Sequence, residues 1–380
     1  MPAFLNDRLM NISRRSLLLA VPAFYLAPRR ASGAVPAAGA FPLADMEAEA
    51  RKLLEKHKLP ALAAGILTAD GLKQSLAVGV RKAGEGKVVT LKDQWHIGSN
   101  TKAMTATLLG GFVEKGQVGW DDTLESVIPE DCRGCAPEVK KITVRQLLQH
   151  RSGLPANTNW SAIPADKRRE ILRSAAPEGT VIEPGKTYLY SNTGYGVAGR
   201  ITEKLGNKPW ESLMEQRLFK PLGMKKSGFG PVGARRGDQP WPHDENGKPR
   251  AVNGDNPPSL GPAGTVHCTL EDYAFFAADH LKGAAGKPAL LKKETYTELH
   301  RPSPDSPYAC GWSIEDHSWA GGLAYTHNGS NTSNYFTAKL SPSRQFGILV
   351  CTNEGGPAAT EGAHALSRLM AEAWVAWSKY

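Results

Sequence analysis

Strand-like segments lie at the two ends of this chain, and helix-like segments fill the stretch between them. Apolar runs typical of strands cover residues 61–68, 72–80, 312–315, 323–327, 335–340 and 345–352. Helical periodicity marks residues 45–58, 101–115, 143–150, 195–205, 210–219, 270–281 and 363–377. We therefore expect an α/β (α+β) fold in which an antiparallel sheet is built from both chain ends, with flanking helices plus a helical lobe formed by the middle.

The composition is that of a globular chain with a sizeable core. Of the 380 residues, 41% are hydrophobic and 22% are charged, which excludes intrinsic disorder as the main state. The formal net charge is +9, but five arginines fall within the first 40 residues, so the excess over the remainder is mild. No basic run with interleaved aromatic residues occurs, and we expect no nucleic acid partner.

Residues 1–40 have the pattern of an export signal. Ser13-Arg14-Arg15-Ser16 resembles a twin-arginine signal, an apolar stretch follows over 17–27, and small residues offer cleavage near 32–34 or 38–40. The stretch is too short to span a bilayer, although an uncleaved amphipathic anchor is an alternative. We expect a bacterial protein that is periplasmic or secreted, with one domain over 41–380 and no membrane span in the mature chain.

Five cysteines are too few for a disulfide-built scaffold. Cys132 and Cys135 are close enough in sequence to close a tight loop, and export permits a disulfide, so we expect this pair to be oxidised. We expect Cys268, Cys310 and Cys351 to be buried free thiols. A metal site is disfavoured, because no second cysteine pair or histidine pair stands at zinc spacing.

A candidate nucleophile is the serine of Ser99-Asn100-Thr101-Lys102, the one S-x-x-K of the chain. It follows a strand-to-turn segment over 95–98 and opens a helix, where positions i and i+3 share a face, so the lysine amine can reach the hydroxyl. Serine needs such a neighbouring base, because it is a poor nucleophile at its free pKa. Burial of Lys102 would lower its pKa and let it accept the proton. The bland alternative is a serine helix cap beside a solvated lysine.

Two further triplets complete the candidates. Tyr190-Ser191-Asn192 follows a strand-like run over 186–189; its phenol can hold or relay a proton beside a lysine, and its amide can anchor that lysine. His327-Asn328-Gly329 lies on a strand-like stretch, where glycine permits close approach and the next amide, of Ser330, can face a developing oxyanion. Taken singly, each triplet is uninformative.

Two other enzyme classes are disfavoured. Gly194, Gly196 and Gly199 form a literal G-x-G-x-x-G, but no βαβ unit surrounds it, so helix packing explains the glycines better than dinucleotide binding. No G-x-S-x-G occurs, which argues against an α/β-hydrolase.

In the order S-x-x-K, Y-x-N, H-x-G, the chain resembles the β-lactamase-related serine hydrolases, which include class C β-lactamases, D-Ala-D-Ala carboxypeptidases and esterases of the same fold. The resemblance extends over about residues 43–376. It includes an L-L-x-H-x-S-G-L-P segment at 147–155, a P-G…Y-S-N…G…P-L-G-M block from 184 to 224, a P-A-G segment at 262–264 and a Y-x-x-G-W at 308–312.

The resemblance implies a β-lactamase/transpeptidase-like fold and a role for each matched residue. Ser99 would be the acylated nucleophile, and Lys102 with Tyr190 would form the acid/base pair. Asn192 would position Lys102 and the substrate, with His327 and Gly329 lining the site on the edge strand. The amides of Ser99 and Ser330 would form the oxyanion hole. No metal or organic cofactor is implied, and the partner is a small-molecule ester, amide or peptide substrate.

Departures from the family pattern bear on the substrate. His327 stands where β-lactamases often have lysine, and imidazole is mostly uncharged at neutral pH. Arg151 is a second possible source of positive charge in the cleft. We expect an esterase of small acyl esters. A D-Ala-D-Ala carboxypeptidase or β-lactamase is the alternative within the family, and a non-catalytic ligand-binding protein is the alternative outside enzymes.

Overall fold

The computed structural model describes residues 40–176, 179–233 and 238–378. The expected export signal therefore lies outside the described residues, except for Ala40. Phe41–Tyr380 form one compact unit, which contains every candidate residue.

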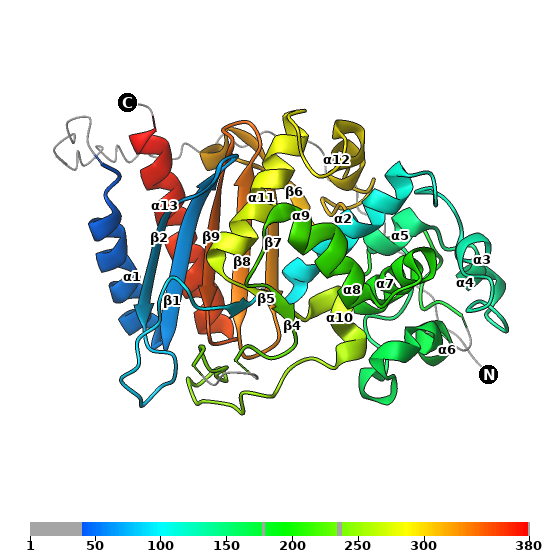
Figure 1. Ribbon diagram of the computed structural model, residues 1–380, viewed down its shortest axis with the longest axis horizontal. Helices are drawn as coiled ribbons and strands as arrows, with labels where there is room; N and C mark the ends of the chain where they lie inside the picture. Colours follow the sequence, from blue (N-terminus) through cyan, green and yellow to red (C-terminus); the bar gives the residue numbers. More distant parts are fainter. Residues whose placement is uncertain (1–39, 177–178, 234–237, 379–380) are drawn as a thin grey trace, which may run out of the picture. The chain divides into compact units, whose positions relative to one another are not determined.

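Six strands form the main sheet: β1 (Ala61–Thr68), β2 (Gly71–Gly79), β6 (Ser313–His317), β7 (Gly322–Ser330), β8 (Tyr335–Ser341) and β9 (Phe346–Thr352). Their order is β2-β1-β9-β8-β7-β6, and every neighbouring pair is antiparallel. β1 pairs with β9, so the two ends of the chain meet inside the sheet (Figure 1). This confirms the expected antiparallel sheet.

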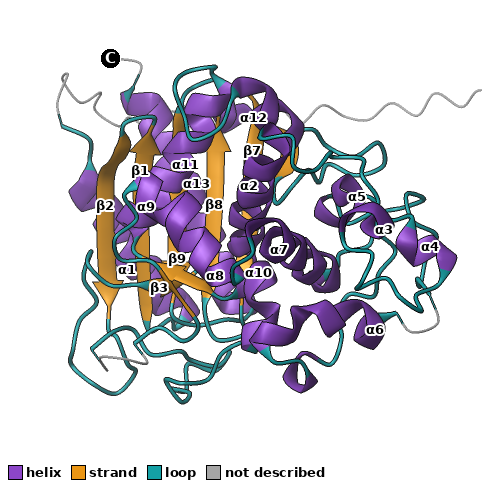
Figure 2. Cartoon of the chain, turned by 45° about the vertical axis from the view of Figure 1, so that its right-hand side comes forward, coloured by secondary structure: helices purple, strands orange, loops and turns teal. Residues whose placement is uncertain are grey.

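The helices cover both faces of the sheet and build the lobe beside it. The longer ones are α1 (Leu43–His57), α2 (Thr101–Glu114), α7 (Asn192–Gly206), α11 (Leu270–Ala284) and α13 (Pro357–Trp377). The shorter ones are α3 (Leu124–Val127), α4 (Pro137–Lys140), α5 (Val144–Leu148), α6 (Ile171–Ala175), α8 (Trp210–Met214), α9 (Lys220–Leu222), α10 (Gly261–Gly264) and α12 (Lys293–Leu299). α1 and α13 pack on one face of the sheet and α11 on the other, while α7 lies in the lobe with α2, α5 and α6 around it (Figure 2).

Two hydrophobic clusters correspond to these layers. One joins the sheet to α1 and α13 through residues such as Ile66, Ile348 and Leu366. The other runs from the opposite face of the sheet through α11 and α2 into the lobe, and it includes Leu67, Phe112 and Phe276. β1 and β9 contribute to both clusters, because a central strand with both faces covered needs apolar side chains on both.

Some local predictions were wrong. The run over 186–189 is not a strand; the Leu189 amide donates to the His150 carbonyl (2.7 Å) and the Tyr188 amide to Asp305 (3.0 Å), so its hydrogen bonds go to loops. The strand expected at the start of 95–98 is present as β3 (Trp95–His96). Its partners in a second sheet, β5 (Val266–Cys268) and β4 (Gly228–Phe229), were not predicted, since two- and three-residue strands leave no period to detect.

The cysteines depart from expectation at one pair. Cys132 and Cys135 are free thiols in the structure, contrary to the expected disulfide. Their segment is instead a backbone-bonded turn, in which the Cys135 amide donates to the Cys132 carbonyl (3.1 Å) and the Cys135 thiol to the Asp131 carbonyl (3.8 Å). Cys268, Cys310 and Cys351 are buried free thiols, as predicted.

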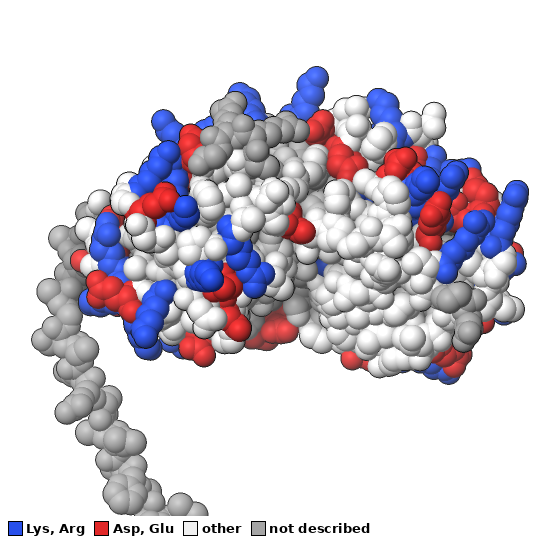
Figure 3. Space-filling model, turned by 90° about the horizontal axis from the view of Figure 1, so that it is seen from below, with Lys and Arg blue, Asp and Glu red and all other residues white. Residues whose placement is uncertain are grey.

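The surface carries charges of both signs. On the face shown in Figure 3, lysines and arginines are interspersed with aspartates and glutamates rather than gathered in one basic field. Over the described ranges, no helix has the length and apolarity needed to cross a membrane.

Candidate active site

Ser99 lies on a short turn between β3 and α2. The 3₁₀ turn η1 (Gly98–Asn100) leads directly into α2, as the sequence predicted. Gly98 has φ +51°, and a Cβ there would lie 2.4 Å from the Ser330 amide nitrogen. Only glycine fits both the backbone angle and this contact. The turn that carries Ser99 is therefore pressed against the end of β7.

Lys102 is one turn further along, fully buried, with its ammonium nitrogen at the centre of three oxygens. Nζ lies 3.1 Å from Ser99 Oγ, 2.7 Å from Asn192 Oδ1 and 2.8 Å from the Ala263 carbonyl oxygen of α10. Burial lowers the pKa of Lys102 well below its usual range. A neutral amine that donates to the Asn192 and Ala263 oxygens directs its lone pair at Ser99 Oγ, which is the geometry of a general base.

Tyr190 and Asn192 approach Lys102 from the start of α7. Ser191 caps this helix, its Oγ accepting from the Gly194 amide (3.0 Å). Asn192 Nδ2 donates to Asn157 (2.9 Å), which leaves Oδ1 for Lys102. The Tyr190 hydroxyl hydrogen-bonds with Ser99, and its ring centroid lies 4.8 Å from Lys102 Nζ. Burial raises the pKa of Tyr190, more than the Ser99 hydrogen bond lowers it, so Tyr190 is held as the neutral phenol.

His327, Gly329 and Ser330 lie on β7, which is not the edge strand expected from the resemblance. β6 is the edge, but its pairing with β7 starts at Ser313 opposite Thr326, so the residues of β7 after Thr326 extend past it. These residues are therefore open on one side, and they face the Ser99 turn. A Cβ on Gly329 would lie 2.7 Å from the Ser99 amide nitrogen.

His327 is a neutral group at this position. Its side chain is buried, and Nε2 lies 2.9 Å from the Tyr308 hydroxyl. Burial is the main reason why the pKa of His327 is lowered, to about 3. Arg151 does not compensate, because its guanidinium is paired with Asp305 and donates to the Gly185 carbonyl. The expectation that Arg151 supplies charge to the cleft was therefore wrong.

Sequence reasoning did not single out His150 and Tyr308, two side chains that support the site. His150, with φ +57°, accepts the Ser191 amide on Nδ1 (3.0 Å) and lies between the rings of Tyr190 (4.2 Å) and Tyr308 (4.5 Å). Both residues occur in segments that carried the family resemblance, yet neither segment shows at sequence level what its side chain touches. The Ala263 carbonyl was also missed, because a backbone acceptor has no residue signature.

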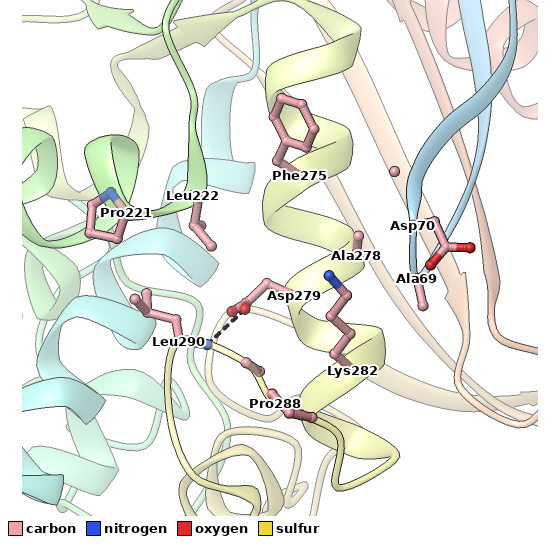
Figure 4. A pocket seen from close by; sticks show the side chains of 12 residues that line it. Ala69, Asp70, Pro221, Leu222, Phe275, Ala278, Asp279, Lys282, Pro288 and Leu290 are labelled. Atoms are coloured by element: carbon pink, nitrogen blue, oxygen red, sulfur yellow. Dashed lines mark hydrogen bonds between the residues drawn. The ribbon is translucent and has the colours of Figure 1, made fainter.

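A cavity of about 500 Å³ opens beside these groups. Its lining residues are Tyr190, Tyr308, Ser313, Glu315, His317, Thr326, His327, Asn328, Lys339 and His364. A second cavity, of about 560 Å³, lies between α11 and the β1–β2 turn and is lined by Phe275, Asp279 and Leu290 among others (Figure 4). The second cavity contains none of the candidate residues.

The chain matches one protein family over most of its length. The β-lactamase family model matches residues 46–372. Penicillin-binding protein 4 of Amycolatopsis lactamdurans is 28% identical over 319 residues, which are 80% of this chain and 83% of that protein. An unguisins hydrolase from Aspergillus campestris is 27% identical over 287 residues, which are 70% of this chain; the chain spans about half of that relative's length (53%).

Solved structures show the same fold. A D-alanine carboxypeptidase AmpC from Burkholderia cenocepacia superposes with a TM-score of 0.69 at 22% sequence identity, and the match covers 86% of this chain and 98% of that one.

Proposed function

The chain belongs to the β-lactamase family of serine hydrolases, and we propose that within it the protein is an esterase of small acyl esters that forms an acyl-enzyme on Ser99. The observation that carries the ester preference is the buried, neutral His327 on the part of β7 that extends past β6. A neutral imidazole at His327 gains little from a substrate carboxylate, whereas an uncharged ester loses nothing by the absence of charge on that ring.

The acylation step follows from the contacts of Lys102. Its neutral amine takes the proton of Ser99 Oγ, and the oxygen attacks the ester carbonyl carbon. The amides of Ser99 and Ser330 hold the resulting oxyanion, since the Gly98 and Gly329 contacts bring these two backbones together. The tetrahedral intermediate then expels the alcohol.

The leaving group and the deacylating water require a second proton carrier. Tyr190, a neutral phenol hydrogen-bonded with Ser99, donates its proton to the departing alkoxide and recovers one from the Lys102 ammonium. In deacylation the amine takes a proton from water, the hydroxide attacks the acyl carbonyl, and Ser99 leaves as the reprotonated alcohol. Asn192 and the Ala263 carbonyl keep Lys102 in place throughout.

The test compares kcat/KM for a p-nitrophenyl butyrate-type ester, a chromogenic cephalosporin and a D-Ala-D-Ala peptide at pH 7–8. We expect the ester to be preferred. A hundredfold preference for the cephalosporin or the peptide, about 2.7 kcal/mol in transition-state free energy, would replace the ester proposal with a cell-wall substrate. The relation to a penicillin-binding protein makes that the competing outcome.

Ser99→Ala separates an enzyme from a binding protein. We expect kcat to fall by about 10⁴-fold or more while the variant keeps the wild-type melting temperature. A fluorophosphonate probe should label the folded wild type at Ser99 and leave the variant unlabelled. Turnover by Ser99→Ala at the wild-type rate, or no labelling of the folded wild type, would contradict the assignment.

A further inference from the structure

A buried group of three side chains lies next to the candidate active site and has no part in the chemistry described above. His96 comes from β3, Asp255 from the loop that precedes α10, and Asn331 from the residue after β7. His96 Nε2 lies 3.1 Å from the Asp255 carboxylate, and both side chains are almost fully buried, at 1% and 3% exposure. Asn331 Nδ2 donates to Asp255 Oδ1 at 2.8 Å.

The histidine in this group holds the backbone of the Ser99 turn. Its Nδ1 accepts the Gly98 amide at 3.1 Å. Since Nδ1 accepts, the ring proton is on Nε2 and points at Asp255. In this tautomer His96 cannot act as a base for Ser99, because the lone pair of Nδ1 already accepts the Gly98 amide.

The carboxylate thus connects the two backbone segments that carry the oxyanion amides. Through His96 it fixes Gly98, the residue before Ser99. Through Asn331 it fixes the residue after Ser330. Burial raises the pKa of Asp255, but His96 and the Asn331 hydrogen bond outweigh it, so the pKa is below its usual value and the carboxylate is charged.

The neighbouring residue strengthens the same connection. Asn256 donates to the Gly264 carbonyl at 2.8 Å, at the end of α10, whose Ala263 carbonyl binds Lys102. One loop dipeptide therefore touches three segments of the site: the Ser99 turn, the end of β7 and the acceptor of the lysine.

We propose that Asp255 and His96 are positioning residues of the hydrolase reaction, which set the distance between the Ser99 and Ser330 amides. The inference rests on the proposed function, because it assigns these amides to the oxyanion hole. Oxyanion donors act on the transition state more than on the bound substrate, so their misplacement lowers kcat and leaves KM nearly unchanged.

Two substitutions of His96 divide its two contacts. His96→Asn keeps an acceptor for the Gly98 amide near the position of Nδ1 but does not reach Asp255. His96→Gln keeps a donor toward Asp255 but lacks that acceptor. The Gly98 turn is connected to Asp255 only while His96 makes both contacts. We therefore expect each variant to lose about 10- to 100-fold in kcat, with KM within about threefold of wild type.

The affinity for a boronic acid distinguishes a positioning role from a merely structural one, which would leave this affinity unchanged. The adduct of a boronic acid with Ser99 is tetrahedral and places an oxygen in the oxyanion position, so the affinity for phenylboronic acid should fall by the same factor as kcat/KM. Asp255→Ala should lose the most, and Asp255→Asn, which still accepts from His96, should recover part of that loss. Asn331→Ala, at a half-buried position, tests the hydrogen bond between Asn331 and Asp255.

The matched control is Asp279→Ala, which removes a buried aspartate far from the site. Asp279 accepts the Leu290 amide at 2.8 Å (Figure 4) and also the Tyr296 hydroxyl. Its loss should therefore lower the melting temperature and leave kcat and boronate affinity unchanged. If Asn331→Ala or the His96 variants keep wild-type kcat, or lose kcat without losing boronate affinity, the positioning role is refuted. If the wild type itself is neither active nor labelled at Ser99, it is the proposed function that fails.

Discussion

Replacing Gly329 by alanine should separate β7 from the turn that carries Ser99. A Cβ at Gly329 would lie 2.0 Å from the Ile97 carbonyl oxygen, 2.7 Å from the Ser99 amide nitrogen and 2.9 Å from Asn100 Nδ2. The first two are backbone atoms, which cannot swing aside as the end of a flexible side chain can. Ordinary contact begins near 3.4 Å, so strand and turn have to part by more than an ångström.

The expected loss of kcat follows from the displacement of the Ser99 turn relative to β7. A shift of about 1 Å in a catalytic group costs about 10²-fold in rate, and complete loss of one oxyanion donor costs about 10²–10³-fold in kcat. We expect Gly329→Ala to lose about 10²–10³-fold in kcat, or about 2.7–4 kcal/mol, with KM near wild type. Overpacking should also cost about 1–3 kcal/mol of unfolding free energy, so the variant melts earlier but folds.

The assay is steady-state hydrolysis of the p-nitrophenyl ester, with thermal melting of each variant. Gly86→Ala is the control, because a Cβ there meets nothing within 4 Å and its φ lies outside the left-handed range. We expect the control to match the wild type in both measurements. A Gly329→Ala variant with kcat within threefold of wild type would mean that catalysis does not depend on the approach of β7 to the Ser99 turn.

Three further expectations concern the proton carriers and the thiols. Losing Lys102, Tyr190 or both should cost nearly the same in kcat, because they act as one unit; multiplication of two modest losses in the double variant would show independence. kcat/KM should rise with pH as Lys102, whose pKa burial lowers, loses its proton, and His327→Gln should keep this acid limb because the limb belongs to Lys102; a limb that disappears with His327→Gln would contradict this. Alkylation of the unfolded chain without reductant should modify all five cysteines, and four-tenths of that signal missing would restore the Cys132–Cys135 disulfide.

Most of the fold could be predicted from the sequence, because the strands and long helices show clear hydrophobic periodicity. Strands β1 and β2 were predicted almost to the residue, since their apolar runs over 61–68 and 72–80 are sharply bounded. The run over 186–189 was wrong for a tertiary reason. It looks like a strand, but the carbonyl of His150 and the carboxylate of Asp305 take its amide hydrogen bonds.

Some residues of the candidate site could be predicted from the sequence and others could not. Ser99 and Lys102 are predictable from spacing, because one helix turn brings them together whatever surrounds them. Tyr190, Asn192 and His327 required the family resemblance, since no local rule places residues so far apart in sequence beside one helix. Asp255 could not be found at all: it lies in a loop rich in Gly and Pro, and its partners come from β3 and from the end of β7.

The pairing of β1 with β9 governs how this polypeptide matures during synthesis. β1 is complete once Thr68 has been made, but its central neighbour follows roughly 280 residues later. Until then the hairpin of β1 and β2 presents an unpaired edge, a surface prone to aggregation in nascent chains. A premature stop before Phe346 therefore removes a central strand rather than a dispensable tail, and it should yield insoluble product instead of a shortened enzyme.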